Sequence, residues 1–168
     1  MTEYALTLIQ RYYKTGVLID TNLLLLYIIG TFAPEEISKF KKTSEFSWDD
    51  FQLLDKLIGL FPKVFTTPHI LTEVSDFAAQ FKPNDKANKI NSALFEVFSQ
   101  LISAFGEVCE SSSDISKKPE FLQFGLADAG IISIGKKYLV LTNDSRLFGY
   151  LQNSGIDANN LNHLRNLI

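Results

Sequence analysis

The sequence predicts an α/β fold in which a central parallel sheet of four to five strands lies between two layers of helices. Short apolar runs alternate with longer amphipathic segments, which is the pattern of strands joined by helical crossovers. Residues 17–19 (Val-Leu-Ile) are apolar at every position, as expected of a strand buried on both faces. A length of 168 residues, of which 46% are hydrophobic, suits one domain with a real core. We therefore expect a single domain spanning residues 1–168.

In the first half of the chain, short apolar runs predict strands at residues 17–19 and 63–66. After a preliminary segment at residues 6–14, apolar spacing predicts helices at residues 23–29, 34–42, 48–61, 69–81 and 85–104. We expect Gly30 to end the first of these helices. Ser47, with Asp50 three residues later, predicts the cap of the third helix. Thr67 and Pro68 predict the start of the fourth, and residues 82–85 predict the break after it.

The second half predicts a weak strand at residues 107–109, followed by the most loop-like stretch of the chain at residues 110–114. The clearest strand of the sequence is at residues 138–142. Helical patterns cover residues 120–136, 144–152 and 161–168. Between the last two of these helices, Ile156 opens an expected edge strand.

Composition limits the classes of function. A net charge of −3 and a pI near 5.4 exclude a protein that holds nucleic acid by a bulk positive field. Local contacts through Lys136, Lys137 and Arg146 stay open. Cys109 is the only cysteine, which excludes an intrachain disulfide and is compatible with a reducing compartment. Because neither a signal peptide nor a run long enough to span a bilayer is present, we expect a soluble, cytoplasmic protein.

Four acids follow or flank the predicted strands, each within a recognisable local phrase. The phrases are Ile-Asp-Thr-Asn around Asp20, Thr-Pro-His-Ile-Leu-Thr-Glu ending at Glu73, Ala-Asp-Ala-Gly-Ile-Ile around Asp128, and Leu-Thr-Asn-Asp ending at Asp144. Carboxylates gathered in a partly buried pocket repel one another unless a cation lies among them. Oxygen ligands alone favour Mg²⁺ or Mn²⁺ over zinc. The four acids therefore indicate a divalent metal site.

Each acid also has a purely structural interpretation. Asp20 and Asp144 stand where a helix N-cap is expected, and Glu73 lies one turn inside a helix, where acids are commonly solvated. Asp128 differs because it lies among apolar residues, where an unpaired carboxylate is costly. Taken together, the four favour a functional site.

In this order, the four phrases resemble the PIN-domain family of metal-dependent nucleases, and the match covers nearly the whole chain. The resemblance implies that Asp20, Glu73, Asp128 and Asp144 form a catalytic, metal-binding cluster at the carboxyl end of a parallel sheet. Asp20 and Asp144 would be direct ligands, Asp128 direct or through water, and Glu73 either a ligand or the residue that positions the attacking water. The segment at residues 31–50 is longer than in compact members of the family.

The resemblance further implies that Asn22, Thr142 and Asn143 orient the carboxylates or a water molecule. It implies an RNA substrate cut by a ribonuclease activity and, for small free-standing members, an inhibitory antitoxin partner. No residue here identifies such a partner, and a homodimer is left open.

Two other functions remain as alternatives. A phosphohydrolase of the haloacid-dehalogenase type also places an acid after its first strand, but it requires a second acid where this chain has Asn22. The other alternative is a non-catalytic interaction domain that kept the fold, although the presence of all four acids argues against it. The two histidines, His69 and His163, have no spacing that indicates a zinc site or a Cys-His nucleophile.

Overall fold

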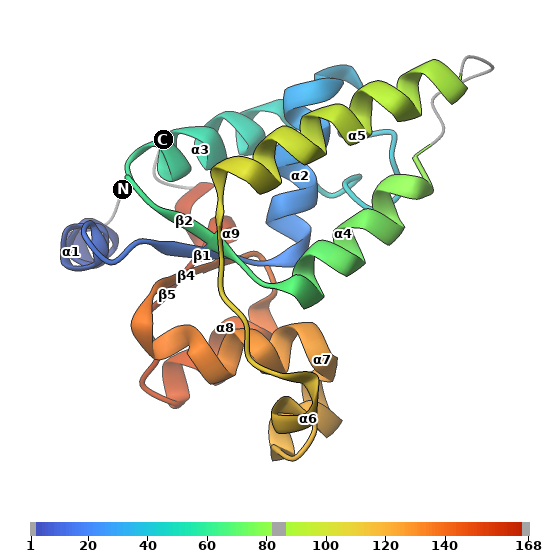
Figure 1. The fold of residues 1–168 in the computed structure, drawn as a ribbon. Coiled ribbons are helices and arrows are strands. Elements are labelled where there is room, and N and C mark those ends of the chain that lie inside the picture. The colour runs from blue at the N-terminus through green and yellow to red at the C-terminus, as the bar shows by residue number, and fades with distance from the viewer. Residues whose placement is uncertain (1–2, 82–86, 166–168) are drawn as a thin grey trace.

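The structure is a computed structural model that describes residues 3–81 and 87–165, with the backbone alone for residues 87–92 (Figure 1). A five-stranded sheet has the order β3-β2-β1-β4-β5, and all neighbouring strands are parallel. The strands are β1 (Val17–Ile19), β2 (Val64–Thr66), β3 (Gly106–Glu107), β4 (Leu139–Thr142) and β5 (Ala158–Asn160). This confirms the predicted α/β class and the central parallel sheet.

Helices cover both faces of the sheet, with α2, α3 and α5 above it and α7 and α8 below it in Figure 1. The helices are α1 (Glu3–Tyr12), α2 (Thr21–Phe32), α3 (Trp48–Gly59), α4 (Pro68–Ala79), α5 (Ala87–Ala104), α6 (Ser112–Ile115), α7 (Pro119–Ile134), α8 (Ser145–Asn153) and α9 (Leu161–Leu164). Two 3₁₀ turns, η1 (Pro34–Glu36) and η3 (Gly135–Lys137), complete the described elements. Across the described residues, no helix combines the length and apolar character that crossing a lipid bilayer requires.

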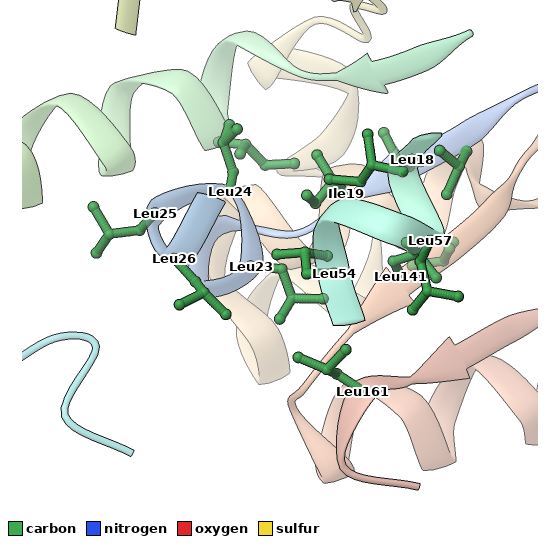
Figure 2. Packing of buried hydrophobic residues seen from close by; sticks show 14 of the residues in the cluster. Leu18, Ile19, Leu23, Leu24, Leu25, Leu26, Leu54, Leu57, Leu141 and Leu161 are labelled. Carbon is green, nitrogen blue, oxygen red and sulfur yellow. The ribbon is translucent and has the colours of Figure 1, made fainter. Parts of the chain in front are cut away.

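The core is centred on β1 and α2. All three residues of β1 are fully buried, as expected of an inner strand of a parallel sheet. Helix α2 is apolar on nearly every side because α3, α4 and α5 surround it. Figure 2 shows Leu23 of α2 beside Leu54 of α3, and the labelled core residues are Leu18, Ile19, Leu23, Leu24, Leu25, Leu26, Leu54, Leu57, Leu141 and Leu161.

Two of the predicted helix starts are confirmed in atomic detail. Ser47 caps α3, where its hydroxyl accepts from the N–H of Asp50 at 3.2 Å and Asp50 accepts from the N–H of Ser47 at 2.7 Å. Thr67 caps α4 by accepting from the N–H of Ile70 at 3.2 Å, with Pro68 in the first turn. The predicted break at residues 82–85, the start of the long helix at Asp85 and the end of the last helix lie outside the described residues.

The expectation that Gly30 ends the first helix is wrong, because α2 continues to Phe32. Gly30 serves a different purpose, which is to let the ring of Phe51 on α3 pack against the backbone of α2. A Cβ atom at position 30 would lie 2.2 Å from Cδ2 of Phe51, far inside van der Waals contact. The glycine therefore marks a close helix–helix approach.

The helix predicted at residues 34–42 is also wrong. Only η1 is helical, and a series of turns follows it. The hydroxyl of Thr43, fully buried, donates to the carbonyl of Ile37 at 2.7 Å, so a side chain binds a backbone group that a continuing helix would use. This side-chain bond stabilises a compact turn in place of the helix.

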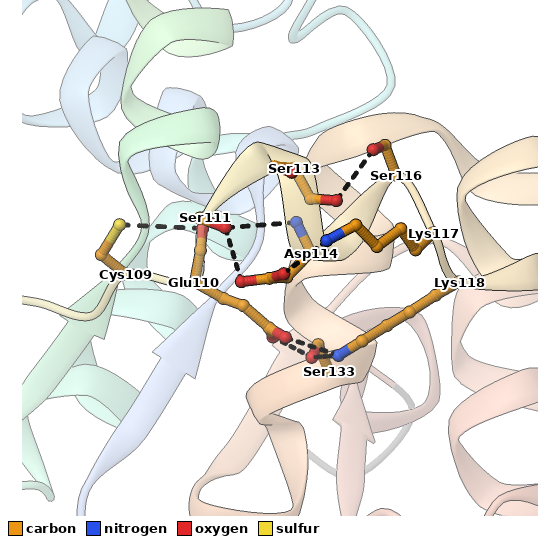
Figure 3. Close-up of polar contacts among 9 residues, drawn as sticks. All are labelled: Cys109, Glu110, Ser111, Ser113, Asp114, Ser116, Lys117, Lys118 and Ser133. Atoms are coloured by element: carbon orange, nitrogen blue, oxygen red, sulfur yellow. Dashed lines mark hydrogen bonds and ion pairs between the residues drawn. The ribbon is translucent and has the colours of Figure 1, made fainter.

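The stretch at residues 110–114, expected as a loop, contains the one-turn helix α6, which Ser111 caps. Figure 3 shows how this connection is fixed to α7. Lys118 contacts Glu110 at 2.6 Å, and both residues hydrogen-bond with the hydroxyl of Ser133 on α7. Despite its loop-like composition, this segment is an ordered connection whose hydrogen bonds hold α7 in place.

The helix predicted at residues 120–136 forms, but Gly125 breaks it. Gly125 has φ 79° and ψ −176°, a conformation that a residue with a side chain adopts only with strain. The second part of α7 starts just after this glycine and ends at Ile134, where η3 follows. Asp128 therefore lies in the first turn of a new helical segment.

We predict that Gly30→Ala lowers the free energy of unfolding by about 1–3 kcal/mol, because the added methyl group overpacks the α2–α3 contact. Gly59→Ala is the matched control, since a Cβ at that position meets nothing within 4 Å. Urea unfolding followed by circular dichroism measures both. A Gly30→Ala protein as stable as the Gly59→Ala protein would contradict the close packing of Phe51.

Candidate functional site

The pairing of β1 with β4 brings two of the four acids to one edge of the sheet. The strands are parallel with Ile19 opposite Leu141, so both chains leave the sheet at the same end. The N–H of Asp20 donates to the carbonyl of Leu141 at 3.1 Å, which extends this register by one residue. Asp144 follows two residues after Thr142, the last residue of β4. Such a carboxyl edge is where open α/β sheets place their binding sites.

Asp20 is almost completely buried, at 3% exposure, and its carboxylate connects α2 to β4. Oδ1 accepts from the N–H of Leu23 at 2.8 Å and so caps α2. Oδ2 accepts from the N–H of Asn143 at 3.3 Å, and the hydroxyl of Thr142 donates to the same carboxylate. These bonds fix the side chain in one position.

Asp144 caps α8 with one oxygen only. Its Oδ1 accepts from the N–H groups of Arg146 and Leu147 at 2.7 and 2.9 Å. Its own N–H donates to the hydroxyl oxygen of Thr142 at 2.9 Å. No described residue donates a hydrogen bond to Oδ2, so half of this carboxylate stays available for a ligand.

The other two acids come from helices that flank this edge. Glu73 on α4 is exposed, and its Oε2 accepts from the hydroxyl of Thr21 at 2.8 Å. Asp128 on α7 is partly buried, and none of the described residues donates a hydrogen bond to it. An unpartnered carboxylate in such surroundings is costly unless it is protonated or meets a cation.

All four acids line one pocket of about 150 Å³, together with Thr21, Asn22 and Phe77. The expectation that these acids, far apart in sequence, converge at one place is therefore met in the structure. The structural interpretation of Asp20 and Asp144 holds as well, since both cap helices. The two interpretations are compatible because each carboxylate oxygen has two lone pairs and Asp144 caps with a single oxygen. That the acids bind metal or act in catalysis stays a prediction.

Burial and mutual repulsion dominate the electrostatics of the pocket. Burial raises the pKa of Asp20 to about 6, although its hydrogen bonds with Thr142, Leu23 and Asn143 oppose the change. The pKa of Asp128 rises to about 7, first through burial and then through the negative charges of Asp20, Asp144 and Glu73. The guanidinium of Arg146 is the positive charge that opposes this rise.

The donor set fits a hard divalent cation. Oδ2 of Asp144, Oε1 of Glu73 and the carboxylate of Asp128 accept no hydrogen bond from the described residues. All of these donors are oxygen atoms, which suit Mg²⁺ or Mn²⁺. Within the described part of the chain, however, no three His, Cys, Asp or Glu side chains already stand close enough to form a metal site.

The three polar residues that the sequence places beside the acids have different surroundings. The side chain of Thr142 and the backbone N–H of Asn143 both donate to the carboxylate of Asp20. That these residues serve a catalytic site stays a prediction. The amide of Asn143 also donates to Glu45 at 3.1 Å, which ties the longer segment at residues 31–50 to the edge of the site. Asn22 lines the pocket.

Sequence reasoning missed Thr21 and Phe77, which also line the pocket. Both had a local signal, because Thr21 follows Asp20 directly and Phe77 lies one helical turn after Glu73. Of the basic residues considered for nucleic acid, Arg146 lies beside the pocket. Lys136 and Lys137 belong to η3, before β4 begins, and so lie at the opposite end of that strand.

No protein-family model matches the chain, and no curated protein matches it. The resemblance to PIN domains therefore rests on the sequence phrases, and membership of that family stays a prediction.

We predict that, without divalent cations, the protein loses stability as the pH rises from about 4 to about 7. Asp20 and Asp128 have folded-state pKa values of about 6 and about 7, above their ordinary value of 3.8. In this window the folded state holds protons that the unfolded state has released, so each rise in pH favours unfolding.

Asp128→Asn should flatten this dependence and stabilise the cation-free protein at pH 8 by on the order of 1–3 kcal/mol. Urea unfolding in chelator at pH 5 and pH 8 measures the effect. Exposed Asp49, changed to Asn, controls for the loss of one negative charge. If Asp128→Asn were no more stable than wild type at pH 8, the four carboxylates would not be crowded as described.

Proposed function

We propose that the protein is a divalent-cation-dependent endonuclease that hydrolyses phosphodiester bonds, with RNA as its substrate. The observation that carries the proposal is the convergence of Asp20, Glu73, Asp128 and Asp144 on one pocket at the carboxyl edge of the sheet. The resemblance to PIN domains supports the choice of RNA.

A bound Mg²⁺ or Mn²⁺ lowers the pKa of a water molecule and neutralises charge on the phosphate. Asp144 and Asp128 would hold the cation with their unpaired oxygens, and Asp20 with the lone pairs that its hydrogen bonds leave over. Glu73 uses Oε2 for Thr21 and keeps Oε1 open, so it either completes the ligand set or orients the attacking water. A bound cation also makes the pocket of an acidic protein attractive to a polyanion.

The residue at position 22 argues against the phosphatase alternative. In that chemistry a covalent aspartyl-phosphate would form on Asp20, the acid that follows the first strand. Position 22, where that chemistry requires a second acid, carries the neutral amide of Asn22.

The unpartnered state of Asp128 argues against a non-catalytic interaction domain. Asn at this position would keep the shape of the side chain without repulsion from the other three acids. A purely structural role therefore does not explain why position 128 carries a negative charge. The resemblance to small free-standing PIN proteins extends the proposal to an inhibitory antitoxin partner. A homodimer stays open, and the expected location is the cytoplasm.

We predict that the purified protein cuts a mixed-sequence single-stranded RNA with Mg²⁺ or Mn²⁺ and stops when a chelator is added. Attack by water on phosphorus, with the 3′-oxygen as the leaving group as the resemblance implies, should leave a 5′-phosphate and a 3′-hydroxyl. Asp144→Asn should lower the rate by at least about tenfold, while the remaining side-chain oxygen still caps α8. Gel analysis and end-sequencing of the products measure these results.

Asp49→Asn is the matched control, because it removes an exposed acid from the first turn of α3 and should leave the rate unchanged. Cleavage that persists in chelator, or products ending in a 2′,3′-cyclic phosphate, would contradict the proposal.

A further inference from the structure

Lys42 brings a positive charge to one side of the acidic pocket. Its Nζ lies 3.9 Å from the centre of the Phe77 ring, and Phe77 lines the pocket with the four acids. The lysine is exposed and forms no ion pair with a described acid. Contact with the ring face holds the long side chain in place while its charge stays accessible to a ligand.

The position of Lys42 depends on the turns that replace the predicted helix. The next residue, Thr43, is fully buried and bonded to the carbonyl of Ile37. In the same segment, the ring of Phe40 packs edge-on against Phe81 at 5.2 Å. These contacts fix the backbone on both sides of Lys42. A groove of about 300 Å³ adjoins it, and its lining is Glu36, Lys39, Phe40, Lys41, Lys42, Gln80 and Phe81.

Arg146 brings a second positive charge from another side of the pocket. It lies in the first turn of α8, two residues after Asp144, and is exposed. Its guanidinium carbon is 4.9 Å from the centre of the Phe124 ring on α7. A guanidinium held on an aromatic face keeps its N–H edge free for bidentate contact with a phosphate. Like Lys42, it forms no ion pair with a described acid.

The two cations therefore flank the pocket from different layers of the molecule. Lys42 reaches it over α4, whereas Arg146 reaches it over α7, and Figure 1 places these helices on opposite sides of the strand ends. Some of the other described cations are instead paired with acids, among them Lys39 with Glu36 and Lys118 with Glu110. An unpaired cation on each side is the arrangement that a polyanion passing over the pocket requires.

We propose that Lys42 and Arg146 bind backbone phosphates of a single-stranded RNA on either side of the acidic pocket, which places the scissile phosphate between them. This inference rests on the proposed function. The pocket, at about 150 Å³, has room for a phosphate group with water and a cation. Beyond Lys42, the adjoining groove contains Lys41 and extends the proposed path of the RNA.

The test is the salt dependence of RNA binding in Mg²⁺. Fluorescence anisotropy with a labelled single-stranded oligouridylate is measured in an Asp144→Asn background, in which cleavage of the probe is slowed. Adding Lys42→Gln and Arg146→Gln should weaken binding at least about tenfold. It should also lower the slope of log K against log salt by about 1.4, which is the value for two lost phosphate contacts on a single strand.

Lys136→Gln with Lys137→Gln is the matched control, since it removes the same charge at the opposite end of β4. This control should keep the wild-type slope, and circular dichroism melting confirms that every variant folds. If the salt slope of RNA binding were equal in the two double variants, this inference would be overturned. Cleavage by the wild type would in that case still support the proposed function. Conversely, a lower slope of log K against log salt in the Lys42/Arg146 double variant would support phosphate binding by these two residues. This holds even if the wild type cuts none of the RNAs tried.

Discussion

The buried carboxylate of Asp20 is the interaction on which the rest of the site depends. One of its oxygens caps α2, the most buried helix of the core, and the other accepts the N–H of Asn143 at the end of β4. An ionised carboxylate in this position is costly, and the three hydrogen bonds offset that cost only in part, since the pKa is still raised. The same group therefore aligns two strand ends and leaves negative charge at the edge of the sheet.

The helices around this edge add to the same pattern. Helices α2 and α8 begin there with an aspartate cap, and the break at Gly125 starts a third helical segment just before Asp128. Helix N-termini favour negative charge, which helps the acids to be tolerated together. They do not remove the repulsion at Asp128, which has no hydrogen-bond donor among the described residues. A divalent cation would satisfy this group, and Phe77 with Lys42 and Phe124 with Arg146 would guide a polyanion towards it.

Local patterns were enough to predict much of the fold and the acids of the site. The apolar run at residues 17–19, the cap at Ser47 and the Thr67-Pro68 helix start are each decided by neighbouring residues, and the structure has them as expected. Two of the errors occurred where packing in the folded chain decides the outcome. Gly30 is required by Phe51, and the turns after η1 depend on the burial of Thr43. The nearness of Lys42 to the acids had no sequence signal, because Phe77 connects them only in the folded chain.

Anomalous diffraction from a crystal soaked in Mn²⁺ tests the central claim most directly, because it locates the cation without relying on activity. We expect a strong anomalous peak among Asp20, Asp128 and Asp144. The absence of a peak there at millimolar Mn²⁺ and pH 8, with the pocket open to solvent in the crystal, would contradict the claim that these four carboxylates form a metal centre.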